Sequence, residues 1–192
     1  MIKVNYKDIR NEMKPGDVIA FGGKGLISGI IKGVTNSPVS HVGIIMQTVL
    51  QGGIFINQII ESNGKKKGLT GTQVWRMSER LSEYDGMVWW LQMNIKIDKQ
   101  HLVDFCLSQK DKEYDTPQAI GSAVDFLPDQ KEDLNKLFCS ELVTAALESV
   151  GVLNDVNASE ATPADVVAFP IYTSICQLKG DNQDIFLTEK TV

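Results

Sequence analysis

In the stretch Phe138-Cys139-Ser140-Glu141-Leu142-Val143, a cysteine stands where a helical pattern begins. Apolar residues recur at helical spacing up to Val150, and Gly151 ends the pattern as a left-handed cap. A thiol at a helix N-terminus lies at the positive end of the helix dipole, which favours the nucleophilic thiolate. The same position also suits a small buried side chain, so the stretch alone leaves a reactive and a structural cysteine open.

A reactive thiolate needs a base, and the chain contains two histidines, His41 and His101. His101 lies on a predicted helix over residues 99–110 whose buried face is already apolar, so we predict an exposed, structural side chain. His41 follows Ser37-Pro38-Val39-Ser40 and opens a predicted strand, so a loop can aim its ring while the strand fixes its backbone. His41 is therefore the candidate base, and the alternative is a structural histidine at a strand edge.

An imidazole base also needs a partner that orients it, and Glu61 is the candidate. Two segments rich in β-branched residues, His41–Thr48 and Ile54–Glu61, predict a β-hairpin. If the hairpin turns around Leu50-Gln51-Gly52, Glu61 lies directly opposite His41 on the same face. A tighter Gly52-Gly53 turn places Glu61 on the other face, so the register decides whether the two side chains meet.

The composition is that of an ordinary globular protein. The chain has 192 residues, of which 43% are hydrophobic and 22% charged, and this predicts one domain over residues 1–192. With 19 Lys and Arg against 24 Asp and Glu, the formal charge of −5 argues against nonspecific nucleic-acid binding. The scattered Cys106, Cys139 and Cys176 form no C-x-x-C pair, so neither a disulfide framework nor a metal site is expected.

Targeting segments are not evident in the sequence. No window approaches the roughly 18 consecutive apolar residues of a membrane span, and the first residues are too polar for a signal-peptide core. We therefore expect no transmembrane segment and, by default, a cytoplasmic protein, a location compatible with release by lysis or by a phage particle. Nothing in the sequence indicates an oligomeric state.

The remaining pattern predicts strands early in the chain and helices late, which is typical of the α+β class. The stretch Val74–Tyr84 is ambiguous, with a strand end followed by one helical turn. Thr162 and Pro163 are typical of a helix start, and a closing strand is expected soon after it. The other expected strands are Val18–Phe21, Met87–Met93 and the closing Val166–Tyr172, and the other expected helices are Gly25–Val34 and Gln118–Leu127.

Six short segments stand in order between residues 17 and 165: Asp17-Val18-Ile19, Thr35-Asn36-Ser37-Pro38-Val39-Ser40-His41-Val42-Gly43-Ile44, Ile60-Glu61, Tyr114-Asp115, Phe138-Cys139-Ser140-Glu141-Leu142-Val143 and Thr162-Pro163-Ala164-Asp165. Together they resemble the landmarks of the circularly permuted NlpC-type papain-like cysteine hydrolases, in their YiiX-like branch. The resemblance implies a permuted papain-like α+β fold, in which an antiparallel sheet packs on the helix that carries the nucleophile.

The same resemblance implies roles for four residues. Cys139 would be the nucleophile, His41 the general base and then acid, Glu61 the residue that orients His41, and Tyr114 a residue near the oxyanion site. The implied reaction cleaves an amide bond, in a cell-wall-type peptide or an N-acyl small molecule, through a thioester and without a metal or organic cofactor. Members that act on the cell envelope are often exported, whereas this chain shows no export signal.

Two alternatives stay open. The permuted branch also resembles lecithin-retinol acyltransferase-like proteins, which use the same cysteine and histidine, so the chain could be an acyltransferase or thioesterase for acyl lipids. Apolar residues beside the histidine loop would then line an acyl pocket, unless they belong to the core: Leu26, Ile27, Ile30 and Ile31. The other alternative is a noncatalytic binding module, against which the presence of both Cys139 and His41 counts.

Overall fold

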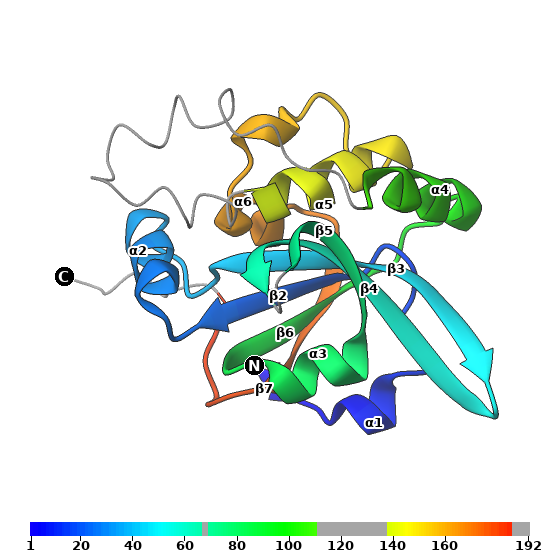
Figure 1. Ribbon diagram of the computed structural model, residues 1–192, viewed down its shortest axis with the longest axis horizontal. Coiled ribbons are helices and arrows are strands. Elements are labelled where there is room, and N and C mark those ends of the chain that lie inside the picture. Colours follow the sequence, from blue (N-terminus) through cyan, green and yellow to red (C-terminus); the bar gives the residue numbers. More distant parts are fainter. Residues whose placement is uncertain (67–68, 111–137, 186–192) are drawn as a thin grey trace.

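One β-sheet forms the centre of the protein (Figure 1). The computed structural model describes residues 1–66, 69–110 and 138–185. Neighbouring strands are antiparallel, except that β1 and β7 are parallel. The combination of this sheet with separate helices is the α+β class that the sequence predicts. Within the described residues the order across the sheet is β1 (Ile2–Lys3), β7 (Tyr172–Lys179), β6 (Gly86–Met93), β2 (Val18–Gly23), β3 (His41–Gln51), β4 (Ile54–Lys66) and β5 (Leu69–Arg76).

Helices cover both faces of this sheet (Figure 1). One face carries α4 (Lys99–Gln109), α5 (Phe138–Ser149) and α6 (Pro163–Ala168), and the other carries α1 (Tyr6–Ile9) and α3 (Met77–Glu83). At one end of the sheet, α2 (Leu26–Val34) follows β2. No described helix combines the length and the apolar character needed to cross a membrane.

The central strand β2 is buried on both sides, which explains its continuous apolar sequence. Val18 and Ala20 belong to the apolar cluster that includes α5, whereas Ile19 and Phe21 belong to the cluster that includes Met77 of α3. Successive strand side chains point to opposite faces, so a strand covered on both faces has no polar alternation. The sheet therefore separates two apolar cores and contributes side chains to both.

The hairpin of β3 and β4 has the tighter of the two turns that the sequence left open. Gln51 pairs with Ile54, so Gly52 and Gly53 alone form the loop. Their φ values of 57° and 75° are the left-handed values that a two-residue hairpin turn requires. Farther down the hairpin the register shifts between Ile45 and Gln47, where β3 contains one extra residue, a β-bulge.

A buried carboxylate ties the start of β2 to β6. Oδ1 of Asp17 accepts the backbone N–H of Met93, and Oδ2 accepts the indole N–H of Trp90 and the backbone N–H of Lys14, each at 2.9 Å. Burial of Asp17 raises the pKa of its carboxyl despite these donors. The side chain therefore serves to satisfy three N–H groups in a place that water does not reach.

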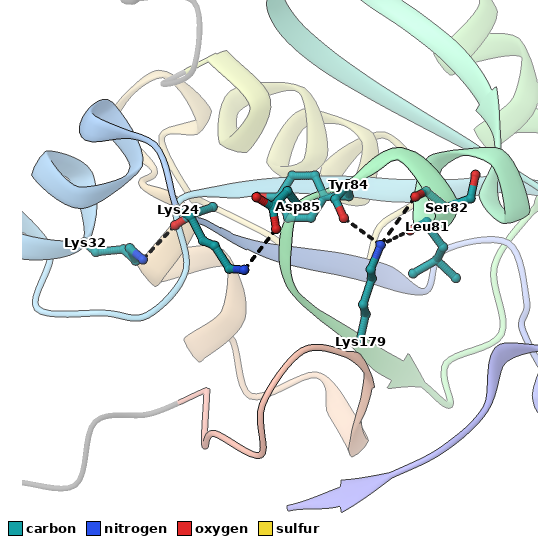
Figure 2. A network of polar contacts seen from close by, with 8 residues as sticks. Lys24, Lys32, Leu81, Ser82, Tyr84, Asp85 and Lys179 are labelled. Atoms are coloured by element: carbon teal, nitrogen blue, oxygen red, sulfur yellow. Dashed lines mark hydrogen bonds and ion pairs between the residues drawn. The ribbon is translucent and has the colours of Figure 1, made fainter.

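We expect Asp17→Asn to lower the free energy of unfolding by about 2 kcal/mol, because an amide NH₂ replaces one acceptor oxygen and leaves a buried N–H without a partner. Urea unfolding measures this change. The matched control is Asp85→Asn, since Asp85 is exposed and pairs only with Lys24 in Figure 2, and its expected effect is below about 0.5 kcal/mol. Equal losses in the two variants would contradict the structural role of Asp17.

The expected closing strand over Val166–Tyr172 is wrong, because its first residues continue α6 and β7 begins only at Tyr172. Thr162 caps this helix as expected, with Pro163 in its first turn. The side chains of Thr162 and Asp165 each accept a backbone N–H of the other residue, forming a capping box. These local bonds outweigh the β-branched character of the valines that follow.

Other expected elements can be placed more simply. The ambiguous stretch Val74–Tyr84 ends β5 and then forms α3. On α4, His101 is exposed, as expected, and Cys106 is buried. The expected helix Gln118–Leu127 lies outside the described residues.

Candidate active site

Cys139 is the second residue of α5, a helix of 12 residues that packs on β3 and β4. Its side chain is fully buried. The next residue fixes this end of the helix, since the Ser140 hydroxyl donates to the carbonyl of Ala161 at 2.5 Å. The thiol thus lies in a firmly anchored first turn, where the helix dipole stabilises negative charge.

His41 begins β3, and its backbone is held against β2. It pairs with Phe21 in the sheet. The preceding residue, Ser40, donates its backbone N–H to the carbonyl of Phe21 at 2.9 Å, and its hydroxyl oxygen accepts the N–H of Gly23 at 3.1 Å. The His41 side chain is 7% exposed, and the centroid of its ring lies 5.4 Å from that of the Phe21 ring. These bonds fix the backbone from which the imidazole projects.

The bulge in β3 brings Glu61 to the face of the sheet that carries His41. The tight turn on its own would put these two side chains on opposite faces. The extra residue shifts the pairing by one, so that Ile44 pairs with Ile60. Glu61 then falls opposite Gly43, two residues from His41 on the same face. The two side chains are diagonal neighbours, which corrects the direct pairing that the wider turn would produce.

The structure brings His41, Glu61 and Cys139 together. Nε2 of His41 lies 2.6 Å from Oε2 of Glu61, whose side chain has no exposed surface. Cys139 lies close enough for its charge to raise the pKa of the His41 imidazole. The carboxylate uses Nε2, and Nδ1 is buried with no hydrogen-bond partner among the described residues, so Nδ1 is the ring nitrogen available to the sulfur. A carboxylate, an imidazole and a thiol therefore stand in series.

Arg80 is a fourth member of this cluster, and sequence reasoning missed it. It lies on α3, and its Nε donates to Oε1 of Glu61. The guanidinium carbon lies 4.7 Å from the ring centroids of both Phe21 and Tyr84, and the residue is only 4% exposed. The sequence offers one signal: the apolar Met77 stands three positions earlier, on the same side of a helix as Arg80, and an apolar residue favours that side as the inner one.

The charges in the cluster shift the pKa values of Glu61 and His41. Burial on its own raises the pKa of Glu61, but the hydrogen bond and charge of His41, followed by those of Arg80, outweigh it and lower the pKa to about 2. Burial on its own lowers the pKa of His41, but Cys139 and then Glu61 outweigh it and raise the pKa to about 9. At neutral pH the cluster holds a carboxylate and an imidazolium.

The pKa shifts of Glu61 and His41 predict a stability optimum at mildly acidic pH. The lowered pKa of Glu61 adds stability that is complete above its ordinary pKa of 4.5 and is lost as the pH falls through about 2. The raised pKa of His41 adds stability that is complete below its ordinary pKa of 6.5 and is lost as the pH rises through about 9. Urea unfolding at a series of pH values measures both slopes, which should flatten in Glu61→Gln. Identical profiles for the two proteins would argue against a coupled pair.

Tyrosine enters the cluster at a position that the sequence did not indicate. Tyr114 lies outside the described residues, whereas Tyr84, the residue that ends α3, packs on Phe21 with 4.9 Å between ring centroids. Burial, partly opposed by the charge of Arg80, raises the pKa of Tyr84, and a side-chain hydrogen bond links it to Ser40. The cluster therefore includes a phenol that stays neutral at physiological pH.

Comparisons with known proteins reveal a structural relative. No family model matches the chain, and no curated protein sequence matches it. Among solved structures, the chain is similar to the crystal structure of the metalloprotein YiiX from Escherichia coli O157:H7, with a TM-score of 0.50 and 17% sequence identity. The match covers 73% of this chain and 67% of the YiiX chain.

YiiX is described as a metalloprotein. In the part of the present chain that the structure describes, no three His, Cys, Asp or Glu side chains are grouped so that they could hold a metal ion. At 17% identity, the likeness concerns the arrangement of the chain in space. This protein therefore has the α+β, papain-like fold that it shares with YiiX.

Proposed function

We propose that this chain is a cysteine hydrolase of the permuted, NlpC-type papain-like kind that cleaves an amide bond, in a cell-wall-type peptide or an N-acyl small molecule. The observation that carries the proposal is the series of hydrogen bonds from Arg80 through Glu61 to His41, with Cys139 close enough for its charge to act on the imidazole. The histidine strand precedes the cysteine helix in the chain, which agrees with the permuted order. The YiiX-like fold supports a papain-like hydrolase as the broader class.

In the proposed reaction, Cys139 is the nucleophile and His41 is the acid and base. The thiolate attacks the amide carbonyl, and the C–N bond breaks as the imidazolium donates its proton to the leaving amine. The acyl group remains on sulfur as a thioester. Neutral His41 then takes a proton from water, the resulting hydroxide attacks the thioester, and the carboxylic acid leaves while the thiolate and imidazolium are restored.

The developing oxyanion needs donors that are already in place. The backbone N–H of Cys139 lies in the first turn of α5, and one such donor is worth about 3 to 4 kcal/mol in related chemistry. The family resemblance suggests Tyr114 as a second donor. Glu61 and Arg80 act through His41 as positioning residues, since Glu61 holds Nε2 and Arg80 keeps that carboxylate ionised.

A substrate comparison tests the proposal. The substrates are a peptidoglycan stem peptide and a short-chain acyl thioester, and the enzymes are the wild type, Cys139→Ala and the matched control Cys176→Ala. We expect the wild type and the control to cleave the stem peptide and Cys139→Ala to leave it intact. Cleavage that persists in Cys139→Ala would overturn the mechanism, and failure on both substrates with an unreactive Cys139 would favour the noncatalytic binding module.

An enzyme acting on acyl lipids is the second candidate, and the surface of α2 favours it. This helix lies between β2 and the loop that leads to His41. Ile30 is 38% exposed and Val34, one turn later, is 76% exposed, so α2 presents an apolar edge to solvent. In the same comparison, cleavage of the acyl thioester without cleavage of the stem peptide would select this candidate.

A further inference from the structure

A hollow of about 610 Å³ lies on the side of the sheet that carries α1 and α3, opposite α5. Its wall comes from the N-terminal segment with α1, from the outer side of α3 and from the end of β7, three regions that Figure 1 shows next to one another. The volume is in the range of small-molecule sites. None of the lining residues belongs to the cluster around Cys139, so the hollow is a separate feature.

The charge of this hollow is positive, although the chain as a whole is acidic. Four cationic residues line it, and no Asp or Glu does: Lys3, Lys7, Arg10 and Lys179. Among the described residues, no carboxylate lies within ion-pair distance of any of these four. A concentration of cations without internal counter-charges attracts an anion from solution.

Two of the cations are held in place by neutral groups. The ammonium of Lys3 donates to the carbonyl of Gly180 at 2.7 Å. Figure 2 shows the ammonium of Lys179 at the end of α3, where it donates to the carbonyls of Leu81 at 2.7 Å and Tyr84 at 2.6 Å. Carbonyl oxygens orient an ammonium but do not cancel its charge, so part of the positive field is arranged before any ligand arrives.

The rest of the wall is largely apolar. Val4, Leu81 and Leu178 contribute aliphatic surface, and Tyr6 contributes its ring. That ring is fixed because its hydroxyl donates to Oδ1 of Asn57 at 2.8 Å. A ligand that matches this wall carries its negative charge on one part and an apolar or aromatic body on another.

We propose that this hollow binds a small phosphomonoester with an apolar or aromatic body. Four cations suit a doubly charged group better than a single carboxylate. Lys7 and Arg10 lie three residues apart, across the turn that ends α1, and they are the groups we assign to the phosphate. The planar guanidinium of Arg10 can bond two phosphate oxygens at once, while an ammonium acts as a point charge.

Calorimetric titration with phenyl phosphate tests the ligand class. We expect saturable binding of phenyl phosphate, weaker binding of inorganic phosphate, which lacks the ring, and no binding of benzyl alcohol, which lacks the charge. Absence of saturable phenyl phosphate binding overturns the proposal. Capture of the protein by phosphatidylglycerol vesicles without phenyl phosphate binding also overturns it, and assigns the positive field to a membrane surface.

Variants locate the binding site. Lys7→Ala/Arg10→Ala should weaken phenyl phosphate binding at least about tenfold, as expected for the loss of two charge-assisted contacts. The matched control is Lys96→Ala/Lys99→Ala, which removes the same charge from exposed residues outside the hollow and should change the affinity by no more than about twofold. Equal losses in both double variants overturn the proposal. Cys139→Ala should bind like the wild type, so the result does not depend on the proposed hydrolase activity.

Discussion

Cys139→Ala is expected to lower the rate of amide hydrolysis by at least about 10⁴-fold, because the reaction loses the atom that forms the thioester. The fold should persist. Cys139 packs in an apolar cluster with Leu142 and Val143, and alanine removes a single buried sulfur, at an expected cost of about 1 kcal/mol. Steady-state assays paired with thermal unfolding separate the two effects. If Cys139→Ala is unfolded, its loss of activity says nothing about the mechanism. In that case Cys139→Ser, which keeps a side chain of similar size, is used in its place.

Alkylation by iodoacetamide at mildly acidic pH examines the same sulfur without any substrate. A thiolate held by an imidazolium reacts under conditions in which ordinary thiols are protonated. Burial raises the pKa of the Cys106 thiol to about 12, so Cys106 should stay unlabelled. Mass spectrometry should find the label in the wild type and in Cys176→Ala, and no label in Cys139→Ala. Label found mainly on Cys106 or Cys176 would refute the assignment of Cys139.

Glu61→Ala is expected to lower the free energy of unfolding by about 3 to 5 kcal/mol, because it leaves the buried guanidinium of Arg80 without its carboxylate. His41 loses its only described partner at Nε2 in the same step. Urea unfolding at neutral pH measures the loss. A decrease below about 1 kcal/mol would show that water reaches Arg80 after all.

A double variant separates this stability effect from the role in orienting His41. Glu61→Leu/Arg80→Met removes both buried charges and keeps apolar volume in the space between Phe21 and Tyr84. We expect it to recover most of the stability that Glu61→Ala loses, since a buried ion pair replaced as a unit costs little. Its activity should stay low, because no carboxylate remains to hold the imidazole. Recovery of activity together with stability would show that Glu61 has a structural role only.

The hairpin illustrates how far local sequence carries a prediction of structure. Two β-branched segments around Gly52-Gly53 predict the two strands, and the structure has both. The relation of His41 to Glu61 could not be derived from the turn, because the bulge between Ile45 and Gln47 reverses the face on which Glu61 lies. Bulges have no short sequence pattern, since they are stabilised by how the strands pack against their neighbours.

Burial of charge was also beyond local reasoning. Arginine side chains are mostly exposed, and the residues next to Arg80 in the sequence do not predict its pairing with Glu61, which lies on β4. The prediction of a closing strand was wrong for another reason. The capping box of Thr162 starts a helix that includes Val166 and Val167, although valine has a high β-propensity. The expectation that His41 and Cys139 lie near each other rested on the need of a thiolate for a base and on the family resemblance, because two residues 98 positions apart give no geometric information of their own.

The bulge has a practical consequence for the outer part of the hairpin, which projects beyond the sheet in Figure 1. The bulge lies between the loop glycines and the His41–Glu61 contact. The pairing of Ile44 with Ile60 therefore does not depend on how many residue pairs the outer part of the hairpin contains. Residues can be trimmed or inserted in matched pairs, for example at Leu50 and Phe55, without moving the histidine. The tip is accordingly a convenient site at which to graft an affinity tag or a reporter.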